Sequence, residues 1–413
     1  YTSKPRDKFL AFGIRTAGRV LDFDTEVQLY TELHFYPGAP PGEDNPGIPA
    51  APEQSCLELD FSTKCVDIFK LKYYLSKRIV QIDELERGAP LSMDFLTEDT
   101  SGFSTLLSWI GNDQYEFDPA ELNREFHTTT RILMDDEKIL MAFKARFHIS
   151  LFTNLRVIAI DTQGLIQRRM LYTSLPYRSI HGYAVQTAGM FDLDSEVILY
   201  TRNRWHLCQI TLDFQAGKTD IMQVQKLLSG IIIGRPTDSK LVFGPKSYGS
   251  NESNPIGLSS FFAQNATEIN SELINMEYHE QIPLLLEEES VLKAFREARD
   301  LYVYTNRRLL IVDAQGLSGK KVKYMSVPYK SIEGFAFETA GHLDRDAEIY
   351  NYTNIAAVLS HDRARYVDLL RTKQSILVSS TDIFEVGKLV LDHTVFDKTL
   401  NKDIVMPELE INY

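Results

Sequence analysis

The stretch that decides the fold is Tyr172–Gly189, YTSLPYRSIHGYAVQTAG, because Tyr324–Gly341 repeats it as YMSVPYKSIEGFAFETAG. The two stretches lie 152 residues apart and share a Ser-x-Pro-Tyr-x-Ser-Ile motif and a final Thr-Ala-Gly. Self-similarity at a fixed distance indicates a duplicated structural unit. This duplication determines how the rest of the chain is divided.

The alignment extends without a gap over residues 153–201, where 23 of 49 positions are identical to the later copy. A third, shorter copy opens the sequence. Residues 1–5 match the start of the quoted stretch, and residues 16–18 match its end. The segment that precedes the quoted stretch in the other copies has no counterpart here, so this copy corresponds to the second half of a unit.

Each copy has the pattern of several short antiparallel strands followed by one helix. Leu151–Ile160 and Leu301–Val312 are rich in β-branched and aromatic residues, and each leads into an Asp-x-Gln-Gly turn. A stretch of helical periodicity then opens at Asp67, Asp220 or Asp382, where an acidic residue suits the helix N-terminus. Asp118 followed by Pro119 marks a further helix start between the copies.

These patterns predict an α+β, β-rich fold of tandem barrels, each with antiparallel strands and a C-terminal capping helix, joined by partly helical connectors. A proline-rich loop at 36–55 interrupts the first copy. The expected boundaries are copy 1 at 1–81 with its N-terminal half missing, a connector at 82–130, copy 2 at 131–234, a connector at 235–283, copy 3 at 284–396 and a C-terminal tail at 397–413.

Several motifs narrow the fold further. In copy 2 they are the run Leu133–Lys144, the Phe152–Arg156 motif and the Ser-x-Pro-Tyr-x-Ser-Ile motif, and in copy 3 they are Glu287–Glu289 and Tyr304–Arg308. Together they resemble the bacterial-type pleckstrin-homology (PH) domain family over most of copies 2 and 3. The resemblance implies PH-like barrels that form oligomers through barrel edges, with no enzymatic activity and no cofactor.

The composition limits the partners. The 413 residues carry 44 basic and 57 acidic side chains, a formal charge of −13, which argues against general nucleic-acid binding. The same charge argues against contact with an anionic membrane surface, without excluding it. No apolar run of about 18 residues occurs, so no transmembrane segment is expected. Three cysteines without C-x-x-C spacing fit a reducing compartment.

No common catalytic motif occurs in the chain, so we expect no enzyme and no catalytic residues. Acidic triplets recur in the three copies, at Asp22, Asp24 and Glu26, at Asp192, Asp194 and Glu196, and at Asp344, Asp346 and Glu348. On a strand such carboxylates stand about 6–7 Å apart, too far for three to reach one ion without a bend. We therefore predict solvated strand faces or partners for basic residues of a neighbour, with a Ca²⁺ or Mg²⁺ site as the alternative.

Basic pairs follow the predicted turn in two copies, at Arg168-Arg169 and Lys320-Lys321. In PH-like barrels a basic loop of this kind can bind a phosphoinositide headgroup, as the family resemblance implies. A solvated hairpin, or an ion pair with an acidic triplet of another copy, is the alternative, and the negative net charge favours it.

The incomplete copy 1 points to assembly. A barrel without its first strands exposes a sheet edge that is a template for pairing. The missing strands precede residue 1 or come from another segment, such as the tail, where Ile404-Val405 and Leu409–Ile411 alternate as in a strand. Between chains such a contact is head to tail and propagates.

We therefore expect a non-enzymatic structural protein whose partner is itself and which forms an extended array, sheet or shell through strand edges and tail. The tandem arrangement also resembles the proteins of the diatom pyrenoid shell, which implies the chloroplast stroma as location. The alternative is a soluble PH-like adaptor that binds lipid headgroups or peptides.

Overall fold

The protein is represented by a computed structural model, in which two compact units are formed by residues 1–179 with 203–208 and by residues 180–202 with 209–413. The boundary between the units lies inside copy 2. The structure describes residues 9–15, 24–35, 54–62, 68–79, 117–128, 132–145, 148–163, 169–188, 194–203, 207–215, 219–234, 241–243, 267–315, 321–339, 346–361, 364–377, 381–396 and 409–411.

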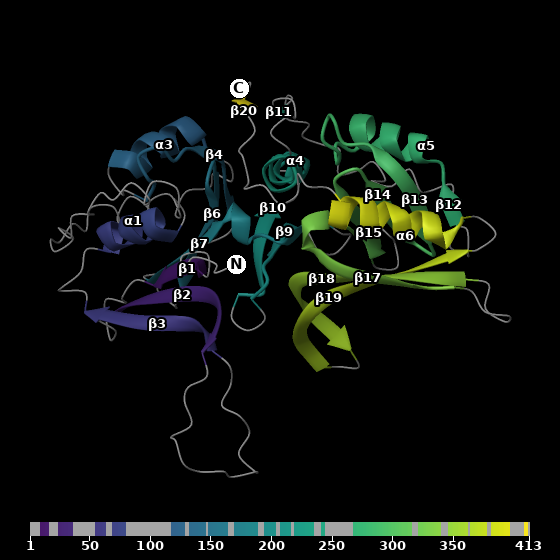
Figure 1. The fold of residues 1–413 in the computed structure, drawn as a ribbon. Coiled ribbons are helices and arrows are strands. Elements are labelled where there is room, and N and C mark those ends of the chain that lie inside the picture. Colours follow the sequence, from purple (N-terminus) through teal and green to yellow (C-terminus); the bar gives the residue numbers. More distant parts are fainter. Residues whose placement is uncertain are drawn as a thin grey trace, which may run out of the picture. The chain divides into compact units, whose positions relative to one another are not determined.

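Unit 1 contains a seven-stranded antiparallel sheet of order β3-β2-β1-β7-β6-β5-β4 (Figure 1). Its strands from copy 1 are β1 (Phe9–Arg15), β2 (Asp24–Phe35) and β3 (Gln54–Ser62), and those from copy 2 are β4 (Ile139–Ala145), β5 (His148–Thr153), β6 (Arg156–Gln163) and β7 (Arg169–Pro176). The helices are α1 (Ile68–Ile79), α3 (Pro119–Thr128) and the 3₁₀ turn η3 (Tyr177–Ser179).

Unit 2 contains an eight-stranded sheet of order β10-β9-β8-β16-β15-β14-β13-β12 and smaller sheets β17-β18-β19 and β11-β20 (Figure 1). Copy 2 contributes β8 (Gly182–Gln186), β9 (Asp194–Tyr200), β10 (Gln209–Gln215) and α4 (Ile221–Ile232). The connector contributes β11 (Leu241–Phe243), β12 (Thr267–Ile269), α5 (Ser271–Met276) and the π-helix η6 (Glu277–Gln281). Copy 3 and the tail contribute β13 (Val291–Glu297), β14 (Asp300–Thr305), β15 (Arg308–Gln315), β16 (Lys321–Pro328), η7 (Tyr329–Ser331), β17 (Ile332–Glu338), β18 (Asp346–His361), β19 (Ala364–Leu377), α6 (Ile383–Leu391), η8 (Asp392–Phe396) and β20 (Leu409–Ile411).

Each copy therefore has two halves. We call β4–β7 and β13–β16 the four-stranded halves, and we call β1–β3 with α1, β8–β10 with α4, and β17–β19 with α6 the three-stranded halves. In both large sheets, the three-stranded half of one copy continues into the four-stranded half of the next copy. We call this contact the junction. Junction 1 joins β1 to β7, and junction 2 joins β8 to β16.

The two junctions have the same register. Phe12 of β1 is the partner of Ser174 in junction 1, and Tyr183 of β8 is the partner of Ser326 in junction 2. Both residue pairs occupy equivalent positions of the aligned copies. Because a slip of one residue would turn every side chain of the strand to the other face, an identical register means that the contact is specified by the repeated sequence.

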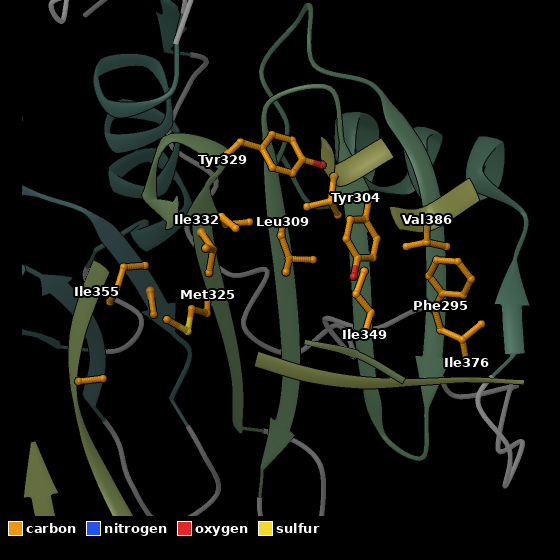
Figure 2. Packing of buried hydrophobic residues seen from close by; sticks show 14 of the residues in the cluster. Phe295, Tyr304, Leu309, Met325, Tyr329, Ile332, Ile349, Ile355, Ile376 and Val386 are labelled. Carbon is orange, nitrogen blue, oxygen red and sulfur yellow. The ribbon is translucent and has the colours of Figure 1, made fainter. Parts of the chain in front are cut away.

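Copy 3 has both of its halves in unit 2, and they pack face to face around one hydrophobic core. Phe295, Tyr304 and Leu309 point inward from β13–β15, and Ile349 and Ile376 meet them from β18 and β19 (Figure 2). All five side chains are buried, and helix α6 closes the core with Val386. This arrangement confirms the predicted β-rich, PH-like fold with a C-terminal helix.

Helix starts were predicted correctly where the structure describes them. The Asp220 carboxylate accepts a hydrogen bond from the backbone N–H of Met222 at 3.1 Å, and Asp382 accepts one from Phe384 at 2.9 Å. Asp118 caps α3 in the same way through Ala120, at 2.9 Å. Asp67 lies outside the described residues.

Two details differ from the sequence prediction. The stretch 151–160 is not one strand, because β5 ends at Thr153 and β6 begins at Arg156. The turn between them is held by Asn154, whose side-chain oxygen accepts from the backbone N–H of Lys138 at 2.7 Å. The second difference concerns the turn that was predicted to begin at Asp161. Asp161 and Gln163 belong to β6, which pairs with β7.

The edge of copy 1 was expected to be unpaired or to pair with the tail, and both expectations are wrong for β1. Strand β7 of copy 2 lies beside β1, because the junction supplies the neighbour. The tail residues Leu409–Ile411 form β20, which pairs in parallel with β11 of the connector. Ile404 and Val405 lie outside the described residues.

Gly182 provides a test of the packing next to junction 2. A Cβ atom there would lie 2.7 Å from Cδ1 of the fully buried Ile355 and 3.3 Å from the carbonyl oxygen of Ser326. Gly182→Ala is therefore expected to destabilise unit 2 by about 1–3 kcal/mol in denaturant unfolding, as overpacking does. The matched control is Gly334→Ala, because nothing lies within 4 Å of a Cβ atom at this equivalent position. Equal stability of the two variants would contradict the packing argument.

Candidate functional site

The centre of junction 2 is a buried ion pair. Arg308 begins β15, and Glu289 precedes β13; both side chains are fully buried. The Arg308 guanidinium donates from Nε to Glu289 Oε1 at 2.9 Å and from Nη2 to Oε2 at 3.1 Å. A two-point contact of this kind fixes the geometry of both groups. Burial lowers the pKa of Arg308, but the Glu289 carboxylate and the Tyr183 hydroxyl together more than offset this effect and raise that pKa above its ordinary value.

The same guanidinium reaches the preceding copy. Arg308 Nη1 donates to the Tyr183 hydroxyl at 2.6 Å and to Ser229 Oγ at 3.1 Å. Tyr183 lies on β8 and Ser229 on α4, so both belong to the three-stranded half of copy 2. Gln225 of α4 adds a hydrogen bond to the Leu284 carbonyl at 2.9 Å. The arginine of copy 3 thus holds the strand and the helix of copy 2 together at the junction.

Junction 1 repeats this network. Arg156 donates from Nε to Glu137 Oε1 at 2.8 Å and from Nη2 to Oε2 at 2.9 Å. Its Nη1 donates to Ser76 Oγ on α1 of copy 1 at 2.6 Å. Ser76 and Ser229 occupy equivalent positions of their helices. The two junctions therefore each use an arginine, a glutamate and a serine at equivalent positions of the copies.

The repeated sequence motif supports this ion pair. Thr305 Oγ1 donates to Glu289 Oε1 at 2.8 Å, and the Tyr329 hydroxyl donates to the Thr305 carbonyl, also at 2.8 Å. In copy 2, Thr153 donates to Glu137 at 2.8 Å, and Tyr177 donates to the Thr153 carbonyl at 2.8 Å. The threonine of the Thr-Asn-x-Arg motif and the tyrosine of the Pro-Tyr motif thus hold in place the glutamate that pairs with the buried arginine.

Two residues of the network differ between the junctions. Phe12 of β1 stands where β8 carries Tyr183, so junction 1 lacks the hydroxyl that accepts from Arg308 in junction 2.

Helix α1 carries Lys72 where α4 carries Gln225. Lys72 is fully buried, and its Nζ lies 3.3 Å from the centroid of the Tyr172 ring. Burial, together with the positive charge of Arg156, lowers the pKa of Lys72 well below its ordinary value, although Glu137 opposes this shift. Junction 1 therefore contains a lysine for which protonation is costly.

The glutamate of each acidic triplet has a local polar partner. Glu26 forms an ion pair with Arg15 at 2.5 Å, and Glu348 forms one with Lys373 at 2.6 Å. Glu196 accepts from Gln186 at 2.8 Å. Asp24 begins β2, whereas Asp22 lies outside the described residues. Over the part of the chain that the structure describes, no three His, Cys, Asp or Glu side chains are placed to hold a metal ion.

The basic pairs are only partly described. Arg169 begins β7 and Lys321 begins β16, while Arg168 and Lys320 fall outside the described residues. Arg169 and Lys321 therefore stand at equivalent ends of two strands that take part in the junctions. The buried ion pairs are formed by other residues, Arg156 with Glu137 and Arg308 with Glu289, which were not predicted as a site.

Copy 3 presents the junction elements a third time. We call the surface formed by Phe337 of β17 and Phe384 of α6 the copy 3 face. Phe337 is 38% exposed and Phe384 58% exposed, and their rings meet edge to face with centroids 5.2 Å apart. The equivalent residue of Phe337 in copy 2 is Val185, which is fully buried in junction 2. Among the described residues, β17 pairs only with β18.

The repeated halves, the closed core of copy 3 and the C-terminal helices define a protein of tandem PH-like domains. A family model described as "Bacterial PH domain" matches residues 110–232 and 257–380, more than half of the chain. The chain belongs to this bacterial PH domain family, which is generally non-catalytic. No helix of the described residues has the length and hydropathy needed to cross a membrane.

Similar proteins include two from Bacillus subtilis (strain 168), both named as uncharacterized. YjqA is 53% identical over 66 residues, which are 16% of this chain and 53% of YjqA, so the chain spans about half the length of that relative. YozO is 35% identical over 98 residues, which are 24% of this chain and 81% of YozO.

Two solved structures are also similar. One is a DUF1696 family protein with a pleckstrin-homology domain from Shewanella loihica PV-4, at 33% identity and a TM-score of 0.24, covering 32% of this chain and all of that one. The other is a pleckstrin-homology domain from Shewanella amazonensis SB2B, at 33% identity and a TM-score of 0.22, covering 32% of this chain and 93% of that one.

Proposed function

We propose that this protein is a non-enzymatic structural protein that associates head to tail with further copies of itself into an extended array. The observation that carries the proposal is the junction, which occurs twice with one register and an equivalent buried arginine, glutamate and serine. The elements of copy 3 that correspond to β8 and α4 are β17 and α6, and among the described residues they make no junction. We expect them to make one with a further copy.

The copy 3 face supports this proposal physically. Phe337 and Phe384 expose large apolar surfaces beside a strand edge, and exposed edges and apolar patches mark sites of association. A contact between the copy 3 face and a different surface of another chain is heterologous, and such contacts build rings or open filaments. Full burial of one exposed phenylalanine side chain stabilises an interface by about 1.5–3 kcal/mol. This free energy corresponds to at least a tenfold change in the affinity between two chains.

The test is Phe337→Glu with Phe384→Glu, compared with the unaltered chain by sedimentation velocity and negative-stain electron microscopy over a concentration series. We expect the mean mass of the unaltered chain to rise with concentration, and we expect the double variant to need at least a tenfold higher concentration for the same mass. The matched control is Leu273→Glu with Met276→Glu, because these exposed apolar residues lie on α5.

Two outcomes would reject the proposal. One is a monomer at every concentration of the unaltered chain. The other is a double variant that associates as strongly as the control. A shell around a pyrenoid, the chloroplast location and the adaptor alternative remain predictions from the sequence, and the bacterial relatives named above do not address them.

A further inference from the structure

Two histidines occupy equivalent places on the helices that precede the four-stranded halves. His127 lies in the last turn of α3 and His279 lies in η6, at the repeat distance of 152 residues. In both rings, each nitrogen lies at hydrogen-bond distance from a backbone carbonyl oxygen. His279 Nδ1 is 2.7 Å from the Asn275 oxygen, and its Nε2 is 3.0 Å from the Leu286 oxygen. The equivalent distances for His127 are 2.6 Å to Asn123 and 3.0 Å to Met134.

These contacts require two donors on each ring. A carbonyl oxygen accepts a hydrogen bond but cannot donate one, so each ring nitrogen that faces it must carry a proton. A neutral imidazole carries one N–H and leaves a lone pair on its other nitrogen, which repels the facing oxygen. An imidazolium cation carries an N–H on both nitrogens and makes both contacts. The geometry of both rings therefore selects the protonated form.

We propose that His127 and His279 are proton-operated latches. With two N–H groups, each ring ties its helix to the turn that leads into the next strand. When the imidazolium releases one proton to solvent, the neutral ring keeps one of the two hydrogen bonds and loses the other. Histidine is the side chain that ordinarily changes charge between pH 5 and 8, so a rising pH opens the latches.

The latch in copy 3 is connected to the ion pair of junction 2. The Leu286 backbone N–H donates to Glu289 Oε2 at 3.1 Å, and Glu289 is the partner of Arg308. Arg308 Nη2 donates to the Leu284 carbonyl at 2.5 Å, as Gln225 does from the preceding copy at 2.9 Å. Residues 284–289 thus contact the latch on one side and junction 2 on the other. Opening of the latch therefore loosens the turn that positions the buried glutamate.

Copy 2 repeats this connection in unit 1. The Met134 backbone N–H donates to Glu137 Oε2 at 3.1 Å, and Arg156 Nη2 donates to the Ile132 carbonyl at 3.1 Å. His127 therefore stands in the same relation to junction 1 as His279 does to junction 2. All of these groups belong to one chain, so the latches do not depend on association between chains.

The charged groups on the elements around each ring are mostly acidic. For His279 they are Glu272, Glu277 and Glu280 on α5 and η6, Glu287–Glu289 in the turn, and Lys293, Arg296 and Glu297 on β13. For His127 they are Glu121, Arg124 and Glu125 on α3, Asp135–Lys138 in the turn, and Lys144 on β4. The net negative charge of both sets suits a cationic ring.

The test follows the backbone amides beside the latch in copy 3. Leu286 supplies both the carbonyl that faces His279 and an N–H, and the Val291 N–H donates to the Asn275 side chain at 3.0 Å. In hydrogen–deuterium exchange of the full chain, we expect the protection factors of Leu286 and Val291 to fall about tenfold or more from pH 5.5 to pH 8.0. His279→Gln is expected to remove this dependence, because glutamine does not titrate.

The matched control is His393→Gln. The ring of His393 has one described carbonyl contact, from Nδ1 to the Leu389 oxygen at 2.9 Å, which a neutral ring satisfies. This variant should therefore keep the pH dependence at Leu286 and Val291. The equivalent experiment in unit 1 uses His127→Gln and follows the amides of Met134 and Ile139.

Other groups of unit 2 also titrate. Burial lowers the pKa of His181 to about 4 and that of Lys330 to about 8, and it raises the pKa of Asp300 to about 6. These three groups are unaltered in both variants. The difference between His279→Gln and His393→Gln therefore reports the ring of His279 alone.

A second measurement detects the ring protons directly. Long-range proton–nitrogen NMR at pH 7 should show both ring nitrogens of His127 and His279 protonated, with the signals assigned by their loss in the glutamine variants. A bare nitrogen in either ring overturns the inference. Equal protection of Leu286 and Val291 at the two pH values in the unaltered chain also overturns it. The same holds for a pH dependence that persists in His279→Gln while β14 and β15 stay protected, which shows that unit 2 is folded.

Discussion

Arg308→Met is expected to lower the free energy of unfolding of unit 2 by about 3–5 kcal/mol, because it leaves the buried Glu289 carboxylate without its partner. The variant also removes the hydrogen bonds of the guanidinium to Tyr183 and Ser229 of the preceding copy. Junction 2 should therefore open together with the core of copy 3. Urea unfolding at pH 7, followed by hydrogen exchange in β8 and β15, measures both effects.

The control is the double variant Arg308→Met with Glu289→Leu. Removal of both charges leaves no unpaired charge, so we expect the double variant to recover most of the lost stability. Arg156→Met should weaken unit 1 instead, because Arg156 makes the equivalent contacts there. A loss below about 1 kcal/mol for Arg308→Met would show that the ion pair does not hold the junction.

The second large effect is a pH dependence at Lys72. The pKa of this buried lysine is lowered in the folded protein, so the unfolded chain binds more protons between the lowered pKa and the ordinary value of 10.5. The stability of unit 1 should therefore rise with pH across this interval, by up to about 1.4 kcal/mol per pH unit. Below the lowered pKa the lysine is protonated in both states, and its contribution no longer changes.

Lys72→Gln, which copies Gln225 of junction 2, is expected to remove this slope and to stabilise unit 1 at neutral pH. Urea unfolding at a series of pH values from 7 to about 10 measures the difference. Lys77→Gln is the control, because Lys77 lies on the same helix, and its ammonium group pairs with the exposed Asp135 at 3.5 Å. Equal slopes for the unaltered chain and Lys72→Gln would show that Lys72 is not the titrating group.

The sequence predicted the class of fold because the signals for that class are local. Alternating apolar residues indicate strands, and the carboxylates of Asp220 and Asp382 cap helices as expected. The sharing of sheets between copies was missed for a physical reason. The apolar pattern of β8 is satisfied equally by a strand of its own copy and by β16 of the next copy. Periodicity gives the face of a strand but not the identity of its neighbour.

The candidate site was missed for a different reason. The signals that suggested a site were exposed charges in predicted turns and the alternating residues of the tail, whereas Arg156 and Arg308 stood out only as members of a family motif. The sequence does contain a signal of the buried ion pair. Arg156 and Arg308 each follow a glutamate by 19 residues, and each adjoins apolar strand residues. A charge kept inside two equivalent apolar runs indicates a buried pair. The serines of the preceding copies could not be inferred, since that contact depends on tertiary structure.

The junction makes the unit of architecture different from the unit of duplication. A duplicated gene segment encodes one copy, but each large sheet is built from the end of one copy and the beginning of the next. Any in-frame duplication of a whole copy therefore adds one complete joint without the evolution of a new interface. The number of copies in one polypeptide therefore sets the number of junctions that it contains.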